Sequence, residues 1–180
     1  MTMSEPIKFY TTKGEFGFMS NFFRSEVQCF GRKWATSEHA YQAQKFAGMK
    51  EEDYNAIHAC ANPMAAAIVG RDPNRTCRPD WEQVRADVMR FVVFHKFSQN
   101  TTIRDALLAT GDRPLFEYDT KRGDQYWAVD ANGVGKNVLG VILMEVREIL
   151  REDIECATCV GETDVQTTTP SNIYLSSLHF

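Results

Sequence analysis

The sequence predicts a mainly α-helical fold with a small β portion (α+β), built as one compact domain. The chain has 180 residues, of which 43% are hydrophobic, enough for one substantial core and too few for a second full domain. Apolar residues recur at helical spacing in the longer segments, whereas strand-like runs are few and short. Helices should therefore dominate, with a few short strands beside them.

Short apolar or aromatic runs predict the strands. Residues 7–10 form one such run, and residues 27–34 form another that Gly31-Arg32 interrupts, so we expect two strands joined by a tight turn there. Residues 115–118 and 126–129 predict two more strands, and the polar loop between them is typical of a hairpin end.

Capping and turn residues bound the predicted helices. Thr36 or Ser37 can cap the first, which should end near Gly48, and Asn62-Pro63 supplies an N-cap and an N1 proline for a short helix ending at Gly70. The predicted helices cover residues 38–48, 51–60, 63–70, 79–99, 101–109 and 137–152. His95 lies on the apolar face of the longest one, where a core histidine is a better interpretation than a metal ligand.

The domain is expected to span residues 1–152, followed by a tail over 153–180. The tail shows no helical period, so we expect it to be mobile or loosely docked, with residues 173–175 and 178–180 apolar enough to dock.

Composition argues against several classes of protein. No run of about 18 apolar residues could span a bilayer, and the first residues resemble no signal peptide, so a cytoplasmic protein without membrane contact is expected. Five scattered cysteines indicate reduced thiols. Cys156 and Cys159 form a CxxC without a second ligand pair, so no metal site is predicted, and no cofactor is expected.

The charge distribution disfavours binding to nucleic acid by bulk electrostatics. Residues 151–180 hold one basic and five acidic side chains, which leaves 20 − 1 = 19 basic and 24 − 5 = 19 acidic residues in the rest of the chain. A local groove formed by Arg71, Arg75 and Arg78 could still hold phosphates.

One helical stripe combines an acid with an amine. Glu38, Tyr41, Gln42 and Lys45 occupy positions i, i+3, i+4 and i+7 of the first predicted helix, which places the first and last roughly 10 Å apart on one face. Such a pair suits a reaction that needs proton transfer plus a nucleophile or a cation stabiliser. An ordinary solvated helix face is the alternative that periodicity leaves open.

Two glycine-containing segments are candidate ligand loops. Residues 14–22 combine glycines, Ser, Asn and aromatics as a nucleoside pocket could use, although alone they form only a turn. Residues 132–137 open the last predicted helix, where free amides could hold a phosphate, but their spacing fits neither common phosphate-binding motif, and a plain helix-start loop is the simpler interpretation.

Short signatures follow one another in a specific order from about residue 7 to residue 151. They are Gly17–Phe22, Ser37–Gln42 with Lys45, Pro63–Ala65, Gly70-Arg71, Asp80-Trp81 with Arg85 and Met89, Lys96-Phe97 with Asn100, Leu107-Leu108, Thr110–Asp112, Glu117, Asp124 with Trp127, Gly135–Gly140, Leu143-Met144 and Val146-Arg147. In this order they resemble the NADAR family, the domain of YbiA-like N-glycosidases that act on riboflavin intermediates. Two features depart from the family pattern: Ala128 stands where the family usually has glycine, and the loop over 119–123 differs in length. Both departures bear on the choice of substrate.

The resemblance implies hydrolysis of the bond between ribose C1 and a base or amine nitrogen. Its substrate would be a phosphoribosylamino pyrimidine intermediate of riboflavin synthesis or ADP-ribosylated guanine, as a small-molecule nucleotide or within DNA. Glu38 matches the acid/base, Lys45 the amine that attacks C1 to give a Schiff base, and Asp124 a residue that holds ribose hydroxyls or the developing cation. A lysine is a nucleophile only in its neutral form, which requires a lowered pKa, so this role predicts that Lys45 is partly buried.

The resemblance also implies a set of substrate-binding residues. They are Gly17, Ser20, Asn21, Phe22, His39, Gln42, Trp81, Trp127, Gly135 and Asn137. The two tryptophans offer faces for stacking a base, but Trp81 is equally suited to the core, and Asp124 to shaping a hairpin. A non-catalytic sensor of NAD or ADP-ribose is the main alternative function, and a scaffold is a third.

Overall fold

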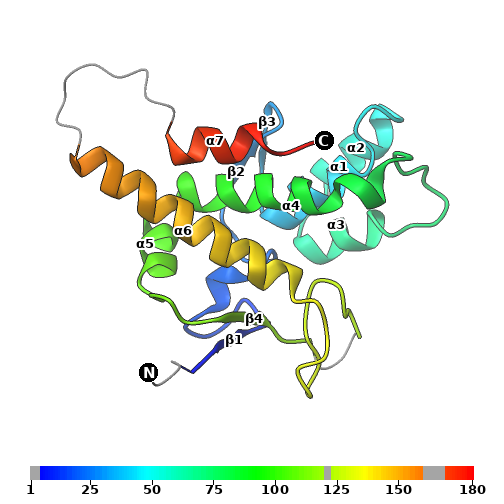
Figure 1. Cartoon of the computed structure of the whole chain (residues 1–180). Coiled ribbons are helices and arrows are strands. Elements are labelled where there is room, and N and C mark those ends of the chain that lie inside the picture. The colour runs from blue at the N-terminus through cyan, green and yellow to red at the C-terminus, as the bar shows by residue number, and fades with distance from the viewer. Residues whose placement is uncertain (1–4, 120–122, 160–168) are drawn as a thin grey trace.

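In the computed structural model, which describes residues 5–119, 123–159 and 169–180, two long helices cross at the centre of the molecule (Figure 1). They are α4 (Trp81–Ser98) and α6 (Val138–Cys159). Their apolar stripes meet, so that side chains such as Val88, Ile142 and Val146 are completely buried. Helix α5 (Thr101–Leu108) packs against both, and the prediction of a mainly helical α+β fold is confirmed.

Three shorter helices pack together at one side of α4 (Figure 1). They are α1 (Ser37–Gln44), α2 (Glu51–His58) and α3 (Pro63–Val69). The expected caps are present: Thr36 accepts the amide of His39, and Asn62 accepts the amide of Ala65. Helix α1 ends at Gln44, four residues before the predicted end, and turns continue to Gly48.

Two small sheets complete the fold. Strand β1 (Ile7–Phe9) pairs in parallel with β4 (Leu115–Glu117), and β2 (Val27–Cys29) pairs with β3 (Arg32–Trp34) as the expected antiparallel hairpin. Its turn residues are Phe30 and Gly31, with φ of 52° and 70°, one position before the prediction. A one-turn 3₁₀ helix, η1 (Gly17–Met19), lies between β1 and β2.

The predicted hairpin between residues 115–118 and 126–129 is wrong. Strand β4 has β1 as its partner, residues 125–127 form turns, and Val129 makes an isolated parallel bridge to Tyr118. The side chain of Asp124 accepts the amides of Tyr126 and Trp127 at 3.2 and 3.0 Å. Such local side-chain bonds draw the backbone away from a strand ladder.

The C-terminal segment is more regular than its sequence suggested. Helix α6 continues past residue 152 to Cys159, and α7 (Pro170–Ser176), capped by Thr169, packs against α6 (Figure 1). The expected lack of helix is therefore wrong for residues 170–176, because Thr169-Pro170 is a helix start. At the apolar end of the chain, the Phe180 ring lies 5.1 Å from that of Phe91. The rest of the predicted tail, residues 160–168, lies outside the described residues.

Within the parts of the chain that the structure describes, no helix is long and apolar enough to cross a membrane. The same described residues contain no group of three or more His, Cys, Asp or Glu side chains that could hold a metal ion.

Candidate active site

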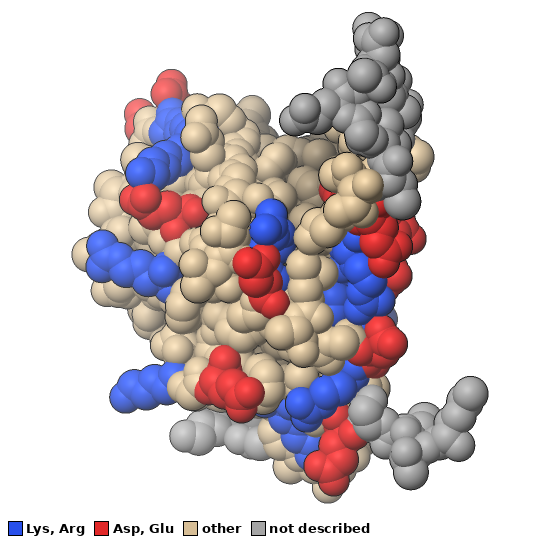
Figure 2. Space-filling model, turned by 90° about the vertical axis from the view of Figure 1, so that its left-hand side faces the viewer, with Lys and Arg blue, Asp and Glu red and all other residues tan. Residues whose placement is uncertain are grey.

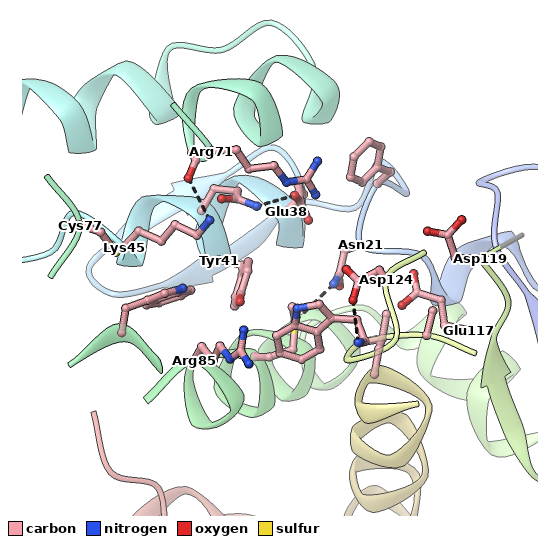
Figure 3. A pocket seen from close by; sticks show the side chains of 18 of the residues that line it. Asn21, Glu38, Tyr41, Lys45, Arg71, Cys77, Arg85, Glu117, Asp119 and Asp124 are labelled. Carbon is pink, nitrogen blue, oxygen red and sulfur yellow. Dashed lines mark hydrogen bonds between the residues drawn. The ribbon is translucent and has the colours of Figure 1, made fainter. Parts of the chain in front are cut away.

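A cavity of about 750 Å³ opens between α1, the start of α4, the loop after α3 and the segments 117–119 and 124–128 (Figure 3). This volume is typical of sites for small molecules and cofactors. Most of the residues predicted to bind or react line it: Ser20, Asn21, Phe22, Glu38, Gln42, Lys45, Trp81, Asp124 and Trp127.

Helix α1 carries the acid and the amine into this cavity. Every residue of α1 is buried, which excludes the alternative of a solvated helix face. The side chain of Glu38 lines the cavity while only 5% exposed. Its Oε1 accepts a hydrogen bond of 2.8 Å from Nε2 of Gln42, one turn further along the helix. That bond orients the carboxyl group towards the ligand space.

Lys45 follows α1 directly and is half-buried, as predicted. Its Nζ donates to the carbonyl oxygen of Gly70 at 2.9 Å and lies 5.8 Å from the centre of the Trp81 ring. Burial lowers the pKa of Lys45, and the positive charge of Arg71 lowers it further, while Cys77 and Glu38 act in the opposite direction. A lowered pKa increases the neutral, nucleophilic fraction of the amine.

Aromatic side chains form one wall of the cavity. The ring of Tyr41 lies 5.1 Å from Trp81 and 5.6 Å from Trp127. Trp81 belongs both to the hydrophobic core and to the cavity lining, so the two interpretations of this residue are compatible. Burial, together with the charge of Glu38, raises the pKa of Tyr41, which keeps its phenol protonated.

Asp124 and Asn21 face the cavity from loops (Figure 3). Oδ1 of Asp124 shapes the turn described above, whereas Oδ2 accepts no hydrogen bond from the residues that the structure describes. Asn21 is held from behind, because its Nδ2 donates to the sulfur of Met89 and its carbonyl accepts the amide of Glu38. The asparagine and the acid are therefore positioned together.

Four predicted substrate-binding residues do not line the cavity: Gly17, His39, Gly135 and Asn137. The ring of His39 is hydrogen-bonded to Thr36 Oγ1 and the carbonyl of Cys60. Asn137 joins β4 to α6 by accepting the amide of Glu117 and donating to the carbonyl of Leu115.

The two glycines of this group are needed for packing. A Cβ at Gly17 would meet the backbone of Thr12, and one at Gly135 the backbone of Ala128. All four residues maintain the fold around the site in this structure.

Several lining residues were not among the predicted site residues: Tyr10, Tyr41, Asp72, Cys77, Arg85, Met89, Glu117 and Asp119. Tyr41 was placed on the α1 stripe, but no role in the site was predicted for it. Two of the three arginines considered for phosphate binding, Arg71 and Arg75, do line the cavity, whereas Arg78 is paired with Asp80 at 2.6 Å and does not.

The half-open, partly aromatic cavity with an acid and a lysine is a candidate small-molecule active site. Acidic and basic side chains alternate on the face shown in Figure 2, without one continuous field of either sign. The NADAR domain model matches residues 8–151, and the chain belongs to the NADAR family.

Similar proteins agree with this assignment. The chain is 42% identical to N-glycosidase YbiA of Escherichia coli over 144 residues, which cover 80% of this chain and 88% of that protein. It is 42% identical to an N-glycosidase of Nostoc punctiforme over 146 residues, 81% of this chain and 92% of the relative. A riboflavin biosynthesis protein of Vibrio vulnificus is 40% identical over 150 residues, 83% of this chain but 40% of the longer relative.

A solved structure of one of these relatives has a similar fold. The NMR structure of E. coli YbiA superposes with a TM-score of 0.76 at 38% identity, covering 92% of this chain and 93% of that one.

Proposed function

We propose that this chain is an N-glycosidase that hydrolyses the bond between ribose C1 and a base or amine nitrogen. The observation that carries the proposal is the buried helix α1, which brings Glu38 and the half-buried Lys45 to one nucleotide-sized cavity (Figure 3). Relatives named N-glycosidases, at 42% identity over most of both chains, support the reaction class.

Glu38 acts as the general acid. As the bond from C1 to nitrogen lengthens, the leaving nitrogen gains charge and must take up a proton, which a positioned carboxylic acid can supply for about 10²- to 10⁴-fold in rate. The Gln42 amide holds the carboxyl group through Oε1, and the carboxyl group supplies the proton. The buried position of Glu38 keeps water from competing with the transfer.

Lys45 acts as the nucleophile. Its neutral amine forms a bond to C1 while the bond to nitrogen breaks, and opening of the ribose ring then gives a Schiff base between Lys45 and C1. Addition of one water molecule releases the sugar and restores the amine, so the net reaction consumes one water. The lowered pKa of Lys45 favours the neutral form that this step requires.

The remaining lining residues suit the rest of a ribonucleotide. Asp124 can accept ribose hydroxyls or stabilise the cationic C1 through Oδ2, and Trp81 and Trp127 can stack on the base. Arg71 has no ion pair or side-chain hydrogen bond among the described residues, which makes it the first candidate for the substrate phosphate.

We favour a free nucleotide, the phosphoribosylamino pyrimidine, as the substrate. Two similar proteins, from V. vulnificus and Zea mays, are named riboflavin biosynthesis proteins. The face shown in Figure 2 carries mixed charges and no continuous basic track. ADP-ribosylated guanine, free or in DNA, is the second substrate to test.

The test is release of the base or amine from both substrates, followed by mass spectrometry. Wild type should release product from at least one of them, while Glu38→Ala and Lys45→Met should each lose nearly all turnover. Lys50→Met removes an exposed lysine outside the cavity and serves as the matched control with normal turnover. Borohydride should trap a sugar adduct on Lys45 in wild type only.

Three outcomes would contradict the proposal in different ways. Turnover by Lys45→Met at the wild-type rate would remove the Schiff base from the mechanism. Binding of ADP-ribose without product release from either substrate would make the protein a sensor. Absence of both binding and turnover would favour a scaffold.

A further inference from the structure

Gly70 lines the cavity beside both reacting side chains and has no side chain that could take part in the proposed reaction. It ends helix α3 and is buried. Its φ of −70° and ψ of −10° are ordinary right-handed helical values, which any residue adopts without strain. Backbone conformation therefore does not explain a glycine at this position.

Space explains it. A Cβ on Gly70 would lie 3.0 Å from Cβ of Gln42, 2.8 Å from its Cδ and closer still to its Oε1. Cβ atoms essentially never approach other heavy atoms within 3.0 Å. The amide of Gln42 thus occupies the volume that any larger residue would need, and it is itself only 2% exposed, with Oε1 buried and lacking a hydrogen-bond partner among the described residues.

The same two residues control the orientation of the acid and the amine. Nε2 of Gln42 donates to Glu38 at 2.8 Å, so an amide pressed against Gly70 determines where the carboxyl group points. The carbonyl oxygen of Gly70 accepts Nζ of Lys45 at 2.9 Å. Gly70 thereby contacts both Gln42, which holds the carboxyl group of Glu38, and the amine of Lys45 itself.

We infer that Gly70 is a positioning residue that sets the arrangement of Glu38 and Lys45 by holding the Gln42 amide on one side and the lysine amine on the other. The inference rests on the proposed N-glycosidase function for its kinetic consequence. Its geometric part concerns only the packing of Gly70 against Gln42.

The direct perturbation is Gly70→Ala. The added methyl group must displace the Gln42 amide and break its bond to Glu38, a hydrogen bond to an ionisable group whose loss corresponds to roughly a ten- to hundredfold fall in kcat. The melting temperature should fall to some extent, because the added methyl group overpacks a buried site, so the melting temperature does not by itself identify a positioning role. KM should change less than kcat, since Trp81, Trp127 and Asp124 are not displaced.

A double-mutant cycle separates positioning from a general structural effect. Gln42→Ala removes the colliding amide and leaves only the Cβ contact of 3.0 Å, which a shift of a few tenths of an ångström relieves. In this background the further change Gly70→Ala should alter kcat by less than about threefold, although alone it costs at least tenfold. Ile68→Ala, an exposed position on the same helix, is the matched control and should leave kcat unchanged. Equal losses from Gly70→Ala in both backgrounds would overturn the inference.

A crystal structure of Gly70→Ala keeps this test independent of the proposed function. Rotation of the Gln42 amide away from Glu38 is the expected result, and an undisturbed bond of 2.8 Å would overturn the inference even in an inactive protein. If wild type turns over neither substrate while the variant shows the displaced amide, the proposed function fails and the geometric role of Gly70 stands.

Discussion

Lys96 is a lysine enclosed in the core next to the cavity, and its burial predicts a measurable pH dependence of stability. The residue is 0% exposed, its Nζ donates to the carbonyl of Ser20 at 2.8 Å, and aromatic rings of Phe23 and Phe97 surround it. No carboxylate of the described residues pairs with it. Burial therefore lowers the pKa of Lys96 from 10.5 to about 7.

The size of the pH effect on the free energy of unfolding follows from this lowered pKa. A pKa that falls from 10.5 to about 7 makes the buried ammonium about 5 kcal/mol less favourable than in the unfolded chain. Below pH 7 both states carry the proton and the full cost is present. Between pH 7 and 10.5 the unfolded chain binds one proton more than the folded protein, so the free energy of unfolding rises by about 1.4 kcal/mol per pH unit from this group.

Lys96→Met removes this contribution while retaining a long side chain. Urea unfolding of wild type and variant at pH 8.0 and 9.5 gives the difference in free energy, in which the other titrating groups largely cancel. We expect the wild type to gain about 2 kcal/mol relative to Lys96→Met over this interval. Lys50→Met, which removes an exposed lysine, controls for the loss of one charge.

A difference that stays constant from pH 8.0 to 9.5 would refute the reasoning. It would mean that Lys96 keeps its proton in the folded protein, and so that water or a carboxylate reaches Nζ. A slope of opposite sign would require a folded-state pKa above that of the unfolded chain.

Three further predictions concern the surroundings of the site and the C-terminal helix. Asn137→Ala should lower the free energy of unfolding by roughly 2–4 kcal/mol, because it loses two hydrogen bonds to backbone groups and leaves alanine at φ 52°; a raised KM at unchanged melting temperature would instead assign it to substrate binding. Arg71→Gln should raise the pKa of Lys45 and move the acidic limb of the kcat profile to higher pH, because the arginine charge lowers that pKa; an unmoved limb would exclude this coupling. Phe180→Ala should cost roughly 1 kcal/mol in denaturant unfolding through its lost ring contacts with Phe30 and Phe91, with kcat unchanged; equal stability would show that the C-terminal end contributes nothing to the core.

Local signals in the sequence located most helices and one hairpin. The cap at Asn62-Pro63 and the turn glycine Gly31 act within a few residues, so their effects could be predicted from spacing alone. The parallel pairing of β1 with β4 could not, because strands more than 100 residues apart in the sequence are brought together by the helices between them. The predicted strand over residues 126–129 does not form, because the side chain of Asp124 accepts the amides of Tyr126 and Trp127 and so favours a turn. The same turn places Asp124 at the cavity.

Some residues of the candidate site could likewise be predicted from local spacing, and others could not. The α1 stripe was predictable, because Glu38, Gln42 and Lys45 share a face through helical period. Arg71, which lines the cavity with them, comes from another segment; its charge and its place in the signature Gly70-Arg71 were the only signals, and neither placed it beside α1. His39 and Asn137 lie within the family signatures, and only the structure shows their hydrogen bonds directed into the protein.

The sequence by itself determined where most of the helices lie, which side chains share the stripe of α1, and which family the order of short signatures resembles. These properties depend on neighbours within a few turns. Only the tertiary structure decided that α1 is buried on every side and that Gly70 leaves room for the Gln42 amide. Burial and electrostatic environment come from whichever segments the fold packs around a group, so the lowered pKa values of Lys45 and Lys96 belong to the fold and not to any short stretch of the chain.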